Sequence, residues 1–228
     1  MVRSKEGFPE ELERQVDDMG DAHASANTNT PLRPGAFEVN DEKKMTIIEE
    51  HFAEIMHTLG LDLNDDSLKG TPRRVAKMFV QEIFGGLDPK RKPRISTFDN
   101  KYQYRRMLVE KNIDVTSTCE HHFLPIFGKA HVAYISSGKV IGLSKINRIV
   151  DYYARRPQVQ ERMTRQILEA LKEALDTEDV MVMVDAKHMC VHARGIQDTE
   201  STTVTVEYGG AFEDADTRRE FLDYVQAR

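Results

Sequence analysis

The chain has 228 residues, of which 39% are hydrophobic, with 32 Lys and Arg against 38 Asp and Glu, two cysteines and no tryptophan. This composition is typical of a soluble globular protein with one domain plus a tail or two small domains, and it excludes collagen-like and wholly disordered chains. No segment approaches the roughly 20 consecutive apolar residues of a membrane helix, and residues 1–40 show no secretory signal. We therefore expect a cytoplasmic protein that has no membrane partner.

The formal net charge of −6 comes from the two ends of the chain, because residues 46–210 carry equal numbers of basic and acidic side chains. A neutral middle provides no field to hold a nucleic acid, so we expect no such partner. One local cluster of cations nevertheless lies within residues 139–165, with only Asp151 and Glu161 opposing it. This cluster predicts either a solvated helix face or a pocket for a compact polyanion such as a phosphate chain.

The first 110 residues contain a predicted arm and two predicted helices. Residues 1–40 mix small polar residues with Gly and Pro, so we expect a flexible acidic arm there. Apolar residues then recur at helical spacing over 41–59, before Gly60. Thr71-Pro72 predicts an N-cap followed by a proline at the first helical position, for a second helix that ends at Gly85-Gly86. Residues 41–110 are thus a helical region ahead of a domain at 111–228.

From about residue 113 the periodicity changes to that of strands. Residues 129–135 alternate, a turn-like Ser-Ser-Gly follows, and residues 139–143 resume an apolar run, so this segment predicts a hairpin. Ser144 is expected to cap the next helix, which Arg156-Pro157 stops.

A further helix is predicted after Pro157 and extends to Leu175. Residues 180–184 and 202–208 are predicted strands, and Thr217 with Glu220 forms a capping box for a closing helix. The order of elements predicts an α+β fold with the sheet and helices in layers.

Both cysteines of the chain lie beside histidines, in Cys119-Glu120-His121-His122 and in His188-Met189-Cys190. Thiolate and imidazole together suit zinc, and the Cys-x-x-His spacing lets one turn present two ligands. Cys119, His122 and Cys190 are therefore the expected ligands. Three protein ligands leave a fourth position open, as in catalytic zinc sites.

Two other interpretations of the cysteines remain open at this point: two buried free thiols, or a redox disulfide. The neighbouring histidines favour the metal site over both. Histidines not used as ligands can transfer protons near neutral pH, which makes His121 and His188 the candidate acid and base. The remaining histidines are expected to be structural: His23, His51, His57, His131 and His192.

Two helix starts are candidate ligand sites. Gly142 to Arg148 passes from a strand end into a helix, and its free N–H groups, with Lys145 and Arg148 on one turn, predict a phosphate site. Simple N-capping is the alternative. Glu161 opens the next helix, where its carboxylate either caps the helix or accepts two parallel hydrogen bonds from the edge of a guanine.

Taken together, these segments resemble GTP cyclohydrolase I, the enzyme family that opens the guanine ring of GTP. The resemblance rests on four motifs in one order: Ser117–His122, Gly142–Arg148, Arg156–Arg162, and His188–Cys190 followed by Ala193-Arg194-Gly195. Weaker similarity extends from Thr30 to the end of the chain, whereas residues 1–28 match nothing in the family.

The resemblance implies zinc as the cofactor, held by Cys119, His122 and Cys190, and a zinc-bound water that attacks C8 of guanine. Formate would leave, and the product would be 7,8-dihydroneopterin triphosphate, in the first step of pterin and tetrahydrofolate biosynthesis. His121, His188 and Ser144 would form the catalytic set, with the two histidines delivering protons. The implied substrate contacts are Glu161 and Gln160 for the base or ribose, Ser144, Lys145, Arg148 and Arg194 for ribose and triphosphate, and Arg74 for the phosphates in a neighbouring subunit's site.

The family resemblance further implies the tunnelling fold, an antiparallel four-stranded sheet with helices on one face, preceded here by N-terminal helices. Its subunits join into barrels, commonly a homodecamer of two pentamers with sites between subunits. Three rivals remain. A pyruvoyl-tetrahydropterin synthase or a nitrile reductase is disfavoured because the former uses three histidines and the latter a reactive cysteine without zinc. A nucleotide-binding protein without catalysis and a structural zinc module are the others.

Overall fold

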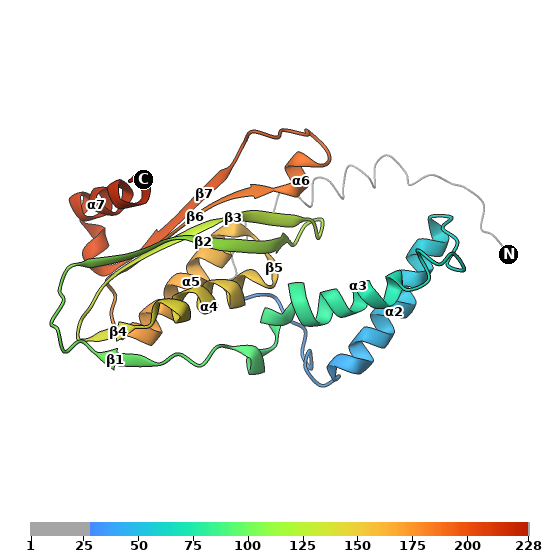
Figure 1. Cartoon of the computed structure of the whole chain (residues 1–228), viewed down its shortest axis with the longest axis horizontal. Coiled ribbons are helices and arrows are strands. Elements are labelled where there is room, and N and C mark those ends of the chain that lie inside the picture. The colour runs from blue at the N-terminus through green and yellow to red at the C-terminus, as the bar shows by residue number, and fades with distance from the viewer. Residues whose placement is uncertain (1–27, 228) are drawn as a thin grey trace.

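The computed structural model describes residues 28–227; residues 1–27, which hold most of the arm predicted over 1–40, and residue 228 lie outside the described residues. A sheet with helices packed on both faces forms the body, and a helical arm projects from one end of it (Figure 1). Within residues 28–227, none of the helices combines the length and apolar character needed to cross a lipid bilayer.

Four long strands form the sheet, each antiparallel to its neighbour. They are β2 (Met107–Cys119), β3 (Pro125–Ile135), β6 (Val180–His188) and β7 (Thr203–Tyr208), in the order β2-β3-β6-β7. A two-residue strand, β5 (Pro157–Gln158), pairs in parallel with the end of β2 at Thr118 and Cys119. This arrangement confirms the predicted α+β class and the tunnelling-type sheet, although helices were expected on one face and the C-terminal helix packs on the other.

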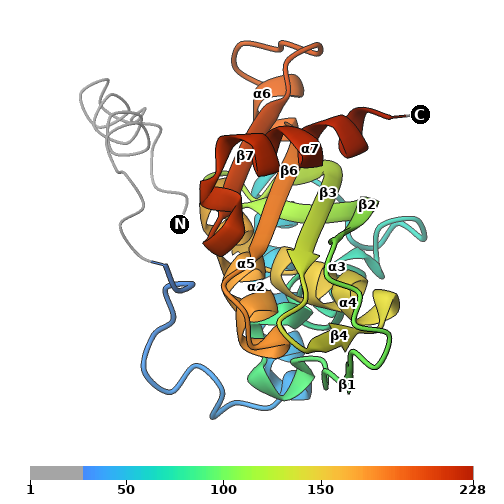
Figure 2. The ribbon, with the colours of Figure 1, turned by 90° about the vertical axis from the view of Figure 1, so that its left-hand side faces the viewer.

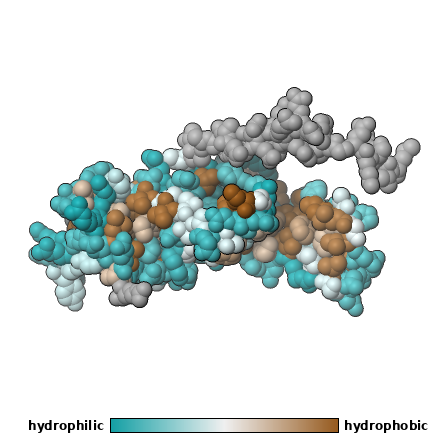
Figure 3. Space-filling model, turned by 90° about the horizontal axis from the view of Figure 1, so that it is seen from above, coloured by the Kyte–Doolittle hydropathy of each residue, from teal (hydrophilic) through white to brown (hydrophobic). Residues whose placement is uncertain are grey.

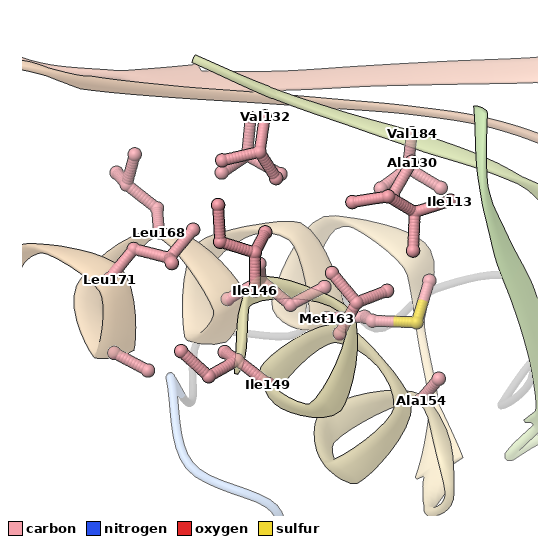
Figure 4. Close-up of a cluster of buried hydrophobic side chains, with 14 of the residues drawn as sticks. Ile113, Ala130, Val132, Ile146, Ile149, Ala154, Met163, Leu168, Leu171 and Val184 are labelled. Carbon is pink, nitrogen blue, oxygen red and sulfur yellow. The ribbon is translucent and has the colours of Figure 1, made fainter. Parts of the chain in front are cut away.

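Helices α4 (Leu143–Ala154) and α5 (Gln160–Leu175) cover one face of the sheet. Alternate strand residues point to that face, and Val132 and Val184 meet Ile146 and Met163 in the main core (Figure 4). Each Val, Leu or Ile side chain buried there stabilises the fold by about 1.5–3 kcal/mol. The core therefore fixes the ends of α4 and α5 relative to the strands, and both helices contribute to the site.

The opposite face carries α7 (Ala215–Gln226), which lies across the strands near one end of the sheet (Figure 2). Its Phe221, together with Phe212 of the preceding 3₁₀ turn η4 (Gly210–Glu213), packs on Met107, Ala133 and Met181 in a second buried cluster. The remainder of this face has no helix over it among the described residues.

The helical arm, which is distinct from the acidic arm predicted over residues 1–40, begins with α2 (Asp41–Thr58), and α3 (Thr71–Lys77) packs against α2. The chain continues through a π-helical turn, η1 (Met78–Ile83), and two 3₁₀ turns, η2 (Gly85–Leu87) and η3 (Pro89–Arg91). Both predicted helices are thus confirmed, although the second continues into a wider π-helical turn and then into tighter 3₁₀ turns. Gly86 is required where the arm meets α4, because a Cβ atom there would lie 2.0 Å from the Tyr152 carbonyl oxygen.

The predicted hairpin over residues 129–143 is wrong. Strand β3 pairs with β2 and β6, whereas β4 (Lys139–Ile141) leaves the sheet and pairs with β1 (Thr97–Asp99). The reason is length, because 11-residue β3 has a partner of similar length in 13-residue β2 and only three residues are available in β4. The sequence pattern did not predict β2 as one strand, since the strand contains a bulge between Glu110 and Ile113 that interrupts its alternation.

Three predicted helix caps are also wrong. Helix α4 starts from Gly142 and α3 from Gly70, so that Ser144 and Thr71 lie inside their helices. At α7 the cap is Asp214, whose carboxylate accepts a hydrogen bond from the Thr217 N–H at 2.8 Å. A charged acceptor makes a stronger cap than the hydroxyl of Thr217 does, and it starts the helix earlier than predicted.

Candidate metal and catalytic site

The two cysteine motifs meet because β2 and β6 are both antiparallel to β3 and hence parallel to each other. Their C-terminal ends therefore lie at the same end of the sheet, where β2 ends at Cys119 and β6 ends at His188. A one-turn helix, α6 (Met189–His192), follows β6 at that end of the sheet (Figure 1), and its Cys190 contacts Cys119. The fold thus joins residues that are about 70 positions apart in the sequence.

The sulfur atoms of Cys119 and Cys190 lie 3.7 Å apart, and Cys119 Sγ lies 3.6 Å from His121 Nδ1. Cys119, Cys190 and His188 each offer a ligand atom within 4.8 Å of the others. Two thiolates on a tetrahedral zinc ion, with Zn–S of about 2.3 Å, would lie about 3.8 Å apart. The donor set and its spacing therefore fit a tetrahedral metal ion of the zinc type.

The electrostatics of the thiol pair agree with this. Burial, and then the neighbouring Cys119, raise the pKa of Cys190 to about 11. Two thiolates side by side therefore need a cation between them. Burial also lowers the pKa of His188, which Glu161 partly opposes, so the imidazole is neutral near pH 7. A neutral ring can bind a metal or accept a proton.

His121 and His122 lie on the exposed turn between β2 and β3. His122 Nε2 contacts Arg194 Nη1 at 2.6 Å, and His122 is outside the cluster formed by Cys119, Cys190 and His188. Of the three predicted metal ligands, the structure brings two together, and His122 as the third stays a prediction. Arg194, predicted as a substrate contact, does lie at this end of the sheet.

Glu161 lies at the first turn of α5, close enough to His188 to affect its charge. Its side chain is exposed and makes no hydrogen bond with other described residues. Val159 occupies the N-cap position without a side-chain bond, so Glu161 does not take the cap either. The carboxylate is therefore available to a ligand beside the Cys and His cluster.

Sequence reasoning assigned no role to an ion pair that supports this site. Arg162 donates two hydrogen bonds to the two carboxylate oxygens of Glu120, at 2.6 and 3.2 Å, and its side chain is 4% exposed. The pair ties the turn after Cys119 to α5. An arginine on the apolar face of a predicted helix was the signal that could have revealed it, because a buried charge needs a partner.

The predicted phosphate contacts lie elsewhere. Ser144 and Lys145 are in the first turn of α4, beside β4, and Arg148 is in its second turn, whereas the cluster lies beyond the other end of the helix, beside β5 (Figure 1). At 1.5 Å per residue, the ten residues from Ser144 to the end of α4 span about 15 Å. Lys145 Nζ donates to the Arg94 carbonyl at 3.2 Å.

Arg74 lies on α3 in the arm, exposed, with hydrogen bonds to Thr71 and Ser67. One chain thus brings together Cys119, Cys190, His188 and Glu161 at one end of the sheet. It does not bring Ser144, Lys145, Arg148 or Arg74 to them.

The chain is similar to known proteins over most of its length. The sequence profile of GTP cyclohydrolase I matches residues 48–226. A GTP cyclohydrolase 1 from Flavobacterium johnsoniae is 64% identical over 211 residues, covering 92% of this chain and 95% of its own. The GTP cyclohydrolase 1 of Salmonella arizonae is 52% identical over 207 residues, covering 90% and 93%.

Among solved structures, an archaeosine synthase QueF-like protein in the apo form covers 46% of this chain and 94% of its own, with 21% identity and a TM-score of 0.39, too slight a likeness to bear on the fold. The profile match and the two relatives span nearly the whole described chain. This chain belongs to the GTP cyclohydrolase I family.

Proposed function

We propose that this protein is a zinc-dependent GTP cyclohydrolase I, a cyclic amidine hydrolase that opens the imidazole ring of guanine in GTP. Formate and 7,8-dihydroneopterin triphosphate are the products, in the first step of pterin and tetrahydrofolate biosynthesis. The observation that carries the proposal is that the ligand atoms of Cys119, Cys190 and His188 lie close together at one end of the sheet, in a chain of this family.

Cys119 and Cys190 would hold zinc with His122 as the third ligand. His122 suits this role because it lies on an exposed turn three residues after Cys119, and its partner Arg194 is also exposed. His188, whose Nε2 is hydrogen-bonded to Gln160, is assigned to proton transfer. The bound metal supplies a water of lowered pKa that is nucleophilic near pH 7.

The residues around the cluster bind the base and move protons. Glu161 accepts hydrogen bonds from N1–H and the exocyclic amine of guanine, which places C8 toward the cysteines. His188 and His121 then transfer protons to the purine nitrogen and during formate release, because both lie at this end of the sheet and an imidazole can donate and accept protons. Arg194, beside His122, contributes a positive charge for the ribose and triphosphate.

The remaining phosphate contacts come from neighbouring subunits. Ser144 and Lys145 lie at the end of α4 away from the cluster, Arg148 lies in the second turn of that helix, and Arg74 lies on the projecting helical arm. Among the described strands, β7 pairs only with β6 and leaves its other edge open, with Val204 and Val206 exposed. Pairing of this edge with β2 of another copy would bury both edges and close a barrel.

The arm also exposes apolar side chains, including Ile55 at 52% and Leu59 at 71% (Figure 3). Such surface is typical of an interface between subunits. We propose the homodecamer of two pentamers that the family resemblance implies. A cytoplasmic location is proposed as well, since two free cysteines suit a reducing compartment.

The decisive experiment incubates metal-analysed protein with GTP and follows formate and the ultraviolet spectrum of the pterin. We expect formate from protein that contains about one zinc per chain, as the three-ligand site requires. Cys119→Ala and Cys190→Ala should lose zinc and formate release while the oligomer stays assembled, and His57→Asn on the exposed face of α2 is the matched control. GTP binding with zinc but no formate would make the protein a nucleotide-binding module instead.

A further inference from the structure

The side chain of Gln160 is 1% exposed and lies between α5 and strands β6 and β7. Its Nε2 donates to the carbonyl oxygens of Val184 at 3.0 Å and Thr203 at 2.8 Å, and its Oε1 lies 2.8 Å from His188 Nε2. Oxygen and nitrogen of a carboxamide are told apart only by their partners. Carbonyl oxygens only accept hydrogen bonds, so the amino group must face them and Oε1 must face His188.

Two hydroxyl groups hold this amide in place. The Thr164 hydroxyl donates its proton to the backbone carbonyl oxygen of Gln160 at 2.8 Å. In the 2.6 Å contact between the Thr164 and Thr205 hydroxyls, Thr205 must therefore be the donor. Thr205 Oγ1 in turn accepts from Gln160 Nε2 at 3.2 Å. The hydrogen bonds form a closed ring that starts and ends on Gln160, and each bond in such a ring polarises the next. Rotation of the carboxamide would break its bonds to Val184, Thr203 and Thr205.

The fixed amide determines the proton position on His188. A carboxamide oxygen can only accept, so His188 Nε2 must carry a hydrogen and donate it to Gln160. This holds for the neutral ring and for the cation alike. In the neutral ring the lone pair is then on Nδ1, which is the one ring atom that can accept a proton or bind a metal ion.

We propose that Gln160 is a positioning residue that fixes His188 as the Nε2–H tautomer and thereby makes Nδ1 its reactive atom. The resemblance implies that Gln160 contacts base or ribose, but its amide already has a protein partner for each polar atom. The catalytic consequence rests on the proposed function, since it requires that His188 moves a proton. The tautomer itself does not depend on the reaction.

The first test is the tautomer of His188 in the full-length, metal-loaded protein labelled with ¹⁵N-histidine. Magic-angle-spinning solid-state NMR distinguishes a protonated from an unprotonated ring nitrogen, and the difference from the His188→Asn spectrum assigns the signals. We expect a protonated Nε2. A His188 ring with its proton on Nδ1 alone would overturn the proposal, and this measurement needs no variant of Gln160.

The second test compares Gln160→Met with Gln166→Met. Gln166 is a buried glutamine on the same helix whose Nε2 donates to the Thr28 carbonyl, whose Oε1 accepts from Gln158, and which contacts no histidine among the described residues. Gln160→Met should give a mixture of His188 tautomers and lower kcat by about 10- to 100-fold, as loss of a histidine's outer partner typically does, with little change in KM for GTP. Gln166→Met should change neither. An unchanged His188 spectrum and kcat in Gln160→Met would refute the positioning role.

The two tests separate this inference from the proposed function. If the unmodified protein releases no formate but shows protonated Nε2 that Gln160→Met disturbs, the positioning role holds and the reaction is wrong. If formate is released but Nδ1 carries the proton, the reaction stands and the role of Gln160 falls.

Discussion

The two ends of α4 differ in how completely one chain builds them. Beyond its C-terminal end, His188 contacts Gln160 at 2.8 Å and Cys119 contacts Cys190 at 3.7 Å, and all four side chains are buried or half-buried. At its N-terminal end, Ser144 and Arg148 are exposed, and Lys145 bonds only a backbone carbonyl. Proton transfer and metal binding need atoms placed within a fraction of an ångström, whereas flexible cations can adapt to a triphosphate. One chain thus assembles the proposed metal half of the site, which contains Cys119, Cys190 and His188. It leaves the proposed phosphate half, which contains Ser144, Lys145 and Arg148, open to solvent or to another chain.

The strongest test of this comparison mixes two inactive variants in one oligomer. Cys190→Ala lacks the metal half, and Lys145→Met with Arg148→Met lacks the phosphate half. If each site combines halves from different chains, random assembly of equal amounts regenerates a complete site in about one quarter of cases. Formate release should therefore return to about a quarter of the unmodified level.

A matched control mixes Cys119→Ala with Cys190→Ala. Both thiols of a site come from one chain, 3.7 Å apart, so this mixture should stay inactive. If the first mixture is equally inactive while native mass spectrometry shows mixed oligomers, the two halves are not combined between chains.

The next largest effect concerns the ion pair between Arg162 and Glu120, which supports the metal half. Arg162→Met leaves the Glu120 carboxylate, 18% exposed, without its partner. Breaking a buried ion pair on one side typically costs about 3–5 kcal/mol in the free energy of unfolding. Denaturant unfolding at one fixed protomer concentration measures this.

Arg165→Met, on the exposed face of the same helix, should stay within about 0.5 kcal/mol of the unmodified protein. An equally small effect for Arg162→Met would mean that the turn carrying Cys119 is held by its other contacts.

A variant of Glu161 tests whether the metal half also binds the base, because this side chain lies beside the Cys and His cluster but is exposed. Glu161→Ala should weaken GTP binding about 5- to 150-fold, as an unpaired guanine edge costs about 1–3 kcal/mol. Equilibrium binding of GTP measures it, and metal content should not change. Glu169→Ala, also exposed on α5, is the control, and equal affinities for the two variants would remove Glu161 from base recognition.

The smallest effect lies on the sheet face away from α4 and α5, at His131, which is 6% exposed. Its Nδ1 accepts a hydrogen bond from the Asn112 N–H at 3.4 Å. Burial lowers the pKa of His131; Lys111 and Lys129 add to this, and Asp185 opposes it. The unfolded chain, with a pKa of about 6.5, therefore binds the proton more readily. The stability that neutral His131 contributes is present above that pH and is lost as pH falls below it.

The unfolding free energy should thus fall with decreasing pH below about 6.5, by at most about 1.4 kcal/mol per pH unit from this residue. His131→Asn, which retains an acceptor near Nδ1, should flatten that slope, and His57→Asn should not. A slope that survives in His131→Asn would assign it to other groups.

Local patterns predicted those elements whose signals are local. Helices α2, α4 and α5 and strands β6 and β7 follow from apolar periodicity and from Gly and Pro at their ends. The Cys and His motifs predicted a metal site because few other functions place thiols beside imidazoles. The hairpin failed, and β2 was missed, because strand pairing depends on partners far away in the sequence and a bulge hides the alternation of β2.

The sequence by itself determined which residues are candidates for the chemistry and, through its motifs, the family that the chain belongs to. Only the tertiary structure decided how they combine. Cys119 meets Cys190 because β2 and β6 both run antiparallel to β3, and Gln160 orients His188 because α5 begins against the ends of β6 and β7. The predicted phosphate contacts on α4 lie toward the end of the helix that is away from the cluster, because α4 is packed along the sheet by its apolar face. Side-chain chemistry is local, whereas proximity is set by strand order and core packing.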